Sequence, residues 1–95
     1  MDSEGWYGLT VRTRDRTVLG RVVGVFAEGP LAGRLRVHGD YTLFRQLTGP
    51  RSGIAVYAIP QRAVVRRGQH SLVLNATLTH ARGTWLMHVL PATQA

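Results

Sequence analysis

Polar and apolar side chains alternate with a period of two along much of this chain, most clearly in YGLTVRTR, residues 7–14. Leu9 and Val11 fall on one side of this segment, whereas Arg12 and Arg14 fall on the other. A strand sends successive side chains to opposite faces of a sheet. The spacing therefore predicts a strand with one buried face and one solvated face.

The same reasoning predicts further strands, bounded by glycine, proline and acidic turn residues. They are residues 17–27, 34–38, 54–59, 65–67, 71–80 and 85–90. Gly20 and Gly24 interrupt the first of these, and glycine inside a strand often marks a bulge or a bend. Residues 40–53 fit one or two helical turns about as well as a strand followed by a loop. The expected fold class is all-β.

The last two expected strands form a C-terminal β-hairpin, residues 71–90, with its turn at residues 81–84. A helix is the competing prediction for the last segment, but Gly83 and the β-branched content favour a strand. That strand is apolar on both faces, which one side of a small core cannot satisfy. It either lies centrally in the core or meets a second copy of the chain, and we favour the homodimer. The residues expected at the dimer interface are Val73, Trp85, Leu86 and Leu90.

The length of 95 residues suits a single domain, residues 1–95, with an ordered core over about residues 6–91. No apolar run reaches the ~20 residues that cross a bilayer. The acidic start, MDSEGWYG, has no apolar signal core, so a cytoplasmic protein is expected. The absence of cysteine excludes disulfides, thiol nucleophiles and cysteine-bound metal centres.

Groups that catalyse reactions are scarce in this sequence. The five acidic residues lie near the amino terminus or beside expected turns, and no pair has catalytic spacing. Nucleotide-binding glycine motifs, nucleophile elbows and zinc-protease motifs are absent. The chain has four histidines: His38, His70, His80 and His88. His80 and His88 could approach each other across the expected hairpin, but no two of the four have the spacing of metal ligands. We expect no enzyme, no metal site and no cofactor.

All 12 basic residues are arginine, and with five acidic residues they give a net charge of +7. A surplus of this size attracts nucleic acid, anionic membrane surfaces or acidic proteins. If the first three strands pair in sequence, five arginines fall on neighbouring outer positions: Arg12, Arg14, Arg21, Arg34 and Arg36. Such a face would bind phosphate oxygens, or would only keep the protein solvated and blunt its edges. Because aromatic residues are not interleaved with these arginines, nucleic acid would be held by its backbone with little sequence selectivity.

Two segments resemble the structural motifs of PRC-barrel domains. LGRVVGVF, residues 19–26, follows a turn with Asp15 as in the opening of that family, although Arg16 stands where the family prefers glycine. AIPQRAV, residues 58–64, followed by a polar turn and SLVL, is similar to the strand–proline–turn–strand ending of the family. The resemblance covers about residues 8–76, and it contains no catalytic residue.

The resemblance implies a small, strongly bent antiparallel β-barrel that serves as an assembly module. Related domains dock onto protein or ribonucleoprotein partners and do no chemistry. The expected function is therefore a non-catalytic, homodimeric interaction module. The alternative is a basic RNA- or DNA-binding protein that uses its arginine-rich β-face. The two readings differ in their response to salt, because phosphate contacts release counterions.

Overall fold

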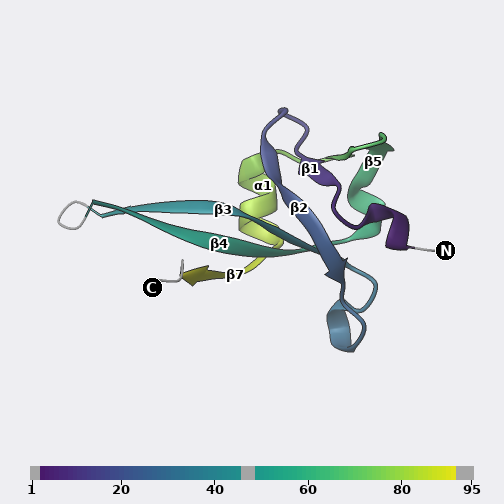
Figure 1. Cartoon of the computed structure of the whole chain (residues 1–95), viewed down its shortest axis with the longest axis horizontal. Coiled ribbons are helices and arrows are strands. Elements are labelled where there is room, and N and C mark those ends of the chain that lie inside the picture. Colours follow the sequence, from purple (N-terminus) through teal and green to yellow (C-terminus); the bar gives the residue numbers. More distant parts are fainter. Residues whose placement is uncertain (1–2, 46–48, 92–95) are drawn as a thin grey trace.

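The computed structural model describes residues 3–45 and 49–91, and the strands in this part form one seven-stranded sheet (Figure 1). In sheet order the strands are β5 (Val64–Arg67), β6 (Ser71–Leu74), β1 (Thr10–Arg12), β2 (Val18–Val25), β3 (Leu35–Arg45), β4 (Gly49–Ile59) and β7 (Leu86–Pro91). The described part also contains the helix α1 (Leu78–Thr84) and the 3₁₀ turns η1 (Ser3–Trp6), η2 (Gly29–Leu31) and η3 (Gln61–Ala63). The all-β prediction is confirmed in part, because strands dominate the described residues but α1 is a helix.

The expected closed, antiparallel barrel is not what the described strands form. β5 and β7 lie at opposite ends of the strand order and leave the sheet open. β1 also pairs with β6 in parallel, with Val11 opposite Leu72, whereas the other neighbouring strands are antiparallel. The chain leaves β6 through α1 and returns as β7 at the free edge of β4, far from β6 in the strand order.

The hydrophobic core lies on one face of this sheet, which we call the inner face. The alternation predicted around β1 is confirmed, because Val11 is fully buried and Leu9 and Thr13 are nearly so. Val22 of β2 pairs with Val37 of β3, and both are buried on the same face. The helix α1 covers part of this face and contributes one buried alanine to the core. Removal of these apolar side chains from water is the main term that stabilises the fold.

The predicted turn between the first two strands forms at Asp15 and Arg16. The Thr13 hydroxyl donates to the Asp15 carboxylate, and the Arg16 backbone N–H donates to the Thr13 carbonyl oxygen over 2.9 Å. Arg16 has a φ of 67°, in the left-handed region that favours glycine. The turn geometry therefore explains why glycine would suit this position better than the arginine found there.

Strands β2 and β3 come into very close contact at Gly20 and Gly39. A Cβ atom on Gly20 would lie 2.2 Å from the His38 carbonyl oxygen, and one on Gly39 would lie 1.8 Å from the Leu19 carbonyl oxygen. Both distances are far inside van der Waals contact, so only glycine fits. The β2–β3 ladder has its last pair next to this contact, between Arg21 and His38. One register shift lies next to Gly20 in the β1–β2 ladder and another lies next to Gly24 in the β2–β3 ladder, so the irregularities predicted at both glycines are confirmed.

Strands β3 and β4 form a long hairpin arm that projects from the rest of the sheet (Figure 1). Their ladder runs without a register shift from the pair Leu35–Ile59 to the pair Arg45–Gly49. The described residues of the range 40–53 therefore belong to strands, which resolves the alternatives left open by the sequence.

The predicted C-terminal hairpin is wrong. β6 ends at Leu74, and α1 begins after Thr77, whose side chain accepts a hydrogen bond from the His80 backbone N–H at 3.2 Å. This N-cap satisfies a donor that the first helical turn would otherwise leave free. Residues 71–90 therefore form a strand, a helix and a strand, and β1, β2, β3 and β4 lie between β6 and β7 in the sheet.

Candidate functional site

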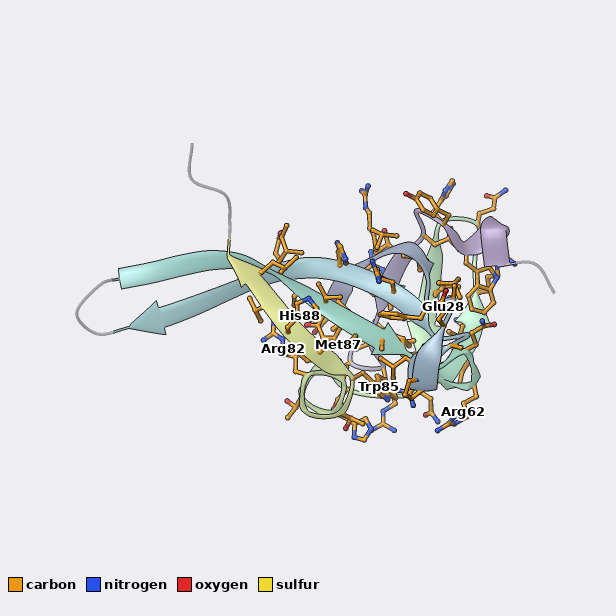
Figure 2. The ribbon with its side chains drawn as sticks, turned by 90° about the horizontal axis from the view of Figure 1, so that it is seen from below. Glu28, Arg62, Arg82, Trp85, Met87 and His88 are labelled. Atoms are coloured by element: carbon orange, nitrogen blue, oxygen red, sulfur yellow. The ribbon has the colours of Figure 1, made fainter. Side chains whose placement is uncertain are left out.

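The sheet face opposite the core, which we call the outer face, carries a continuous cross-strand row. Thr10 pairs with Arg21, Arg21 with His38, His38 with Val56, and Val56 with His88. Residues that are paired directly across a sheet point to the same side of it. The row therefore places one arginine and two histidines on the outer face, and Figure 2 labels one of them, His88.

Three of the five predicted arginines lie along a line across the outer face, which we call the arginine diagonal: Arg12, Arg21 and Arg36. Arg12 lies two residues beyond Thr10 on β1, and Arg36 lies two residues before His38 on β3. Both β1 and β3 run antiparallel to β2, so these two offsets fall on opposite sides of Arg21. A register shift interrupts each ladder between these positions, so Arg12 pairs with Val18 and Arg36 pairs with Gly24, each three residues from Arg21 along β2. The three side chains are exposed, so their charges are open to a ligand.

The other two predicted arginines do not extend the diagonal. Arg34 is half-buried two residues before Arg36, and its Nη1 donates to the Ala58 carbonyl oxygen at 3.4 Å. Arg14 follows the end of β1, and its backbone N–H donates to the Ala76 carbonyl oxygen at 2.7 Å. The structure thus brings together three of the five arginines, and it gives Arg34 a contact within the protein.

A groove of about 690 Å³ opens beside the arginine diagonal. Arg12 and Arg21 line it from β1 and β2, whereas His38 and Asp40 line it from β3 at the base of the arm. Among the described residues that line the groove, Asp40 is the one carboxylate. A phosphate in the groove would therefore be attracted to the two arginines and repelled from the base of the arm.

The position of His38 on the outer face lowers its pKa below the ordinary value of 6.5. Partial burial is the largest cause, because it disfavours the charged imidazolium. The positive charges of Arg36 and His88 add to the effect. His38 is therefore mainly neutral at pH 7, and a phosphate bound beside it would favour its protonation.

The lowered pKa of His38 makes the stability of the fold depend on pH. The unfolded chain binds this proton more tightly than the folded chain does, so the free energy of unfolding is expected to be highest above pH 6.5. The free energy of unfolding falls as the pH drops from 6.5 toward the lower pKa of His38 in the folded chain. Urea unfolding at about pH 8 and about pH 5 measures the decline. His38→Gln should reduce the decline and the exposed control His70→Gln should not; an equal decline in both variants would contradict the assignment.

The residues predicted at a dimer interface are divided between different parts of the sheet. Trp85 and Leu86 are partly buried and pack against the core. Leu90 is 43% exposed, and it pairs with residue 54 on the outer face. Val73 lies on β6, near the opposite edge of the sheet. The structure therefore does not bring these four residues together.

A bulge in β7 explains this division. The register between β4 and β7 shifts by one residue, which makes Met87 an extra residue on β7. Leu86 and Val89 both pack against the core although they are three positions apart. Met87 is 42% exposed, and Figure 2 shows it beside His88 on this strand. An extra residue reverses which face the following side chains occupy. A prediction that assumes strict alternation over residues 85–90 therefore assigns some of these side chains to the wrong face.

The histidines do not form the arrangement considered for a metal. The ring of His80, on α1, lies edge-on to the Trp85 ring with 5.4 Å between the ring centroids, whereas His88 lies on the outer face. Within residues 3–45 and 49–91, no group of three or more His, Cys, Asp or Glu side chains could hold a metal ion. His88 instead contributes to the lowered pKa of His38, and local sequence patterns do not indicate this relation because it depends on the order of β3, β4 and β7.

No protein-family model matches the chain, and neither a curated protein nor a solved structure matches it significantly. Among the described residues, no helix has the length and apolar character needed to cross a membrane.

Proposed function

We propose that the chain is a non-catalytic interaction module that binds the phosphate backbone of a nucleic acid, alone or within a ribonucleoprotein. The observation that carries the proposal is the arginine diagonal, which lines up three exposed guanidinium groups on the sheet face opposite the core. Guanidinium groups bind phosphate oxygens through two parallel hydrogen bonds, and they keep their charge at any physiological pH.

The composition and the surroundings of the diagonal support a polyanion as the ligand. The net charge of +7 attracts such a ligand over distances comparable to the Debye length. Arg12 and Arg21 have no hydrogen bond or ion pair with another residue of the described part, so neither must break a protein contact in order to bind. The resemblance to PRC-barrel domains agrees with a docking role that requires no catalytic group.

The test of this function is the salt dependence of binding to a fluorescent mixed-sequence RNA. Three phosphate contacts to a single strand give a slope of log K against log salt of about −2, so affinity should fall roughly 20-fold between ~50 and ~200 mM salt. Fluorescence anisotropy measures both affinities. Absence of binding at the lower concentration, or binding that does not respond to salt, would contradict the proposal.

A homodimer is a second candidate, and one observation favours it. Ile54, Met87 and Leu90 are about two-fifths exposed at the β7 edge of the sheet, and Ile54 pairs directly with Leu90. Exposed edge strands with apolar side chains readily pair with another chain. The particle mass, measured in the same samples by light scattering, tests this candidate. A mass of two chains supports it, and a mass of one chain excludes it.

A further inference from the structure

A second hollow lies at the other end of the arginine diagonal, where β2 ends. It has a volume of about 410 Å³, and residues 23–28 line it together with Arg36. The guanidinium carbon of Arg36 lies over the Phe26 ring, 4.7 Å from the ring centroid. A planar cation and an aromatic ring therefore form one stacked wall of this hollow.

The floor of the hollow is open because it contains a glycine. Gly24 pairs with Arg36 across the β2–β3 ladder, so a side chain at either position would stand on the outer face. A Cβ atom on Gly24 would meet no atom within 4 Å, which leaves free space beside the guanidinium. Val23 also lines the hollow, and Glu28 supplies the carboxylate. Figure 2 labels Glu28 just beyond the end of β2.

We propose that this hollow binds one nucleobase of a single-stranded nucleic acid, with guanine preferred, an inference that rests on the backbone-binding function proposed above. Bases that are not paired stack on arginine planes and aromatic rings, and the wall formed by Arg36 and Phe26 offers such a surface. A duplex cannot use the hollow, because its bases are stacked on one another and their Watson–Crick edges are occupied.

The preference for guanine follows from the hydrogen-bonding capacity of Glu28. An ionised carboxylate only accepts hydrogen bonds, and it has two oxygens for this purpose. Guanine carries two neighbouring donors on its Watson–Crick edge, the N1–H and the N2 amino group, which match the two oxygens. Adenine, cytosine and uracil each present only one donor group on that edge. The backbone of the same strand would then continue from the hollow along Arg36 toward Arg21 and Arg12.

A substitution that fills the hollow tests the inference without removing any charge. Gly24→Leu should weaken binding of a uracil-rich decamer with one central guanine by about tenfold, because stacking of one base contributes on that scale. Gly83→Leu is the matched control: Gly83 also faces open space, and it lies on α1 away from the outer face. Glu28→Gln should remove the preference for guanine over uracil. Thermal unfolding of each variant confirms that it is folded.

Comparison of several ligands separates this inference from the function on which it rests. The wild-type chain should bind the guanine strand about tenfold more tightly than the same strand with an abasic site at that position. RNA and DNA strands should give the same preference, because the base is common to both. If the abasic strand binds as tightly, or if Gly24→Leu binds like the wild type, the nucleobase site is overturned while salt-dependent backbone binding stands. If no strand binds at low salt, both proposals fail.

Discussion

Replacement of Gly39 by alanine is expected to lower the free energy of unfolding by about 3 kcal/mol, the upper end of the usual cost of overpacking. The added Cβ would lie 1.8 Å from the Leu19 carbonyl oxygen, which is backbone and cannot move aside like the end of a side chain. The strands must separate to relieve this contact, which disturbs the last pair of the β2–β3 ladder, Arg21 with His38. Urea unfolding of the two proteins measures the difference.

Gly24→Ala is the matched control for this prediction. It introduces the same methyl group on β2, but a Cβ at that position meets no atom within 4 Å, so little loss of stability is expected. Gly20 faces Gly39, and their substitutions should be strongly non-additive, because strands that one methyl group has pushed apart accommodate a second more easily. A Gly39→Ala protein as stable as Gly24→Ala would contradict the close strand contact described for β2 and β3.

Simultaneous substitution of Arg12, Arg21 and Arg36 by glutamine is expected to weaken binding of single-stranded RNA by about 100-fold at ~0.1 M salt. Each lost phosphate contact removes the release of roughly 0.7 counterions, and three such losses amount to about two powers of ten at that concentration. The fold should be retained, because all three side chains are exposed on the outer face. Anisotropy titrations of the wild type and the variant at one salt concentration measure the ratio.

A control with the same change in net charge uses Arg14, Arg62 and Arg66, which are exposed and lie off the diagonal. Replacing these three arginines by glutamine lowers the net charge by the same amount. This variant should therefore weaken binding only through the general electrostatic field of the protein. Equal losses in the two triple variants would mean that net charge, and not the line of three guanidinium groups, accounts for the affinity.

The part of the fold that the sequence predicts well is the alternation of single strands. Leu9, Val11 and Thr13 are buried, as their spacing requires, and Arg12 is exposed beside them. This works because the two faces of a strand are set by local geometry alone. The pairing of the first three strands also holds, so that part of the arginine cluster could be predicted.

The errors arise where structure depends on a single extra interaction or on distant partners. The alternation of residues 71–80 does not continue as a strand, because the Thr77 hydroxyl caps α1. The spacing of apolar residues alone does not indicate this hydrogen bond. Met87 shifts the phase of β7 through a bulge whose position depends on the register with β4. The open sheet and the His38–His88 relation both follow from the order of the strands, which no local pattern encodes.

The measurement that tests the arginine diagonal most directly is the salt slope of RNA binding for the wild type and for the two triple variants. The account predicts a slope of about −2 for the wild type and for the Arg14, Arg62 and Arg66 variant. For the Arg12, Arg21 and Arg36 variant it predicts a slope near zero. A slope that remains near −2 after loss of the diagonal would place the phosphate contacts elsewhere and contradict their assignment to these three arginines.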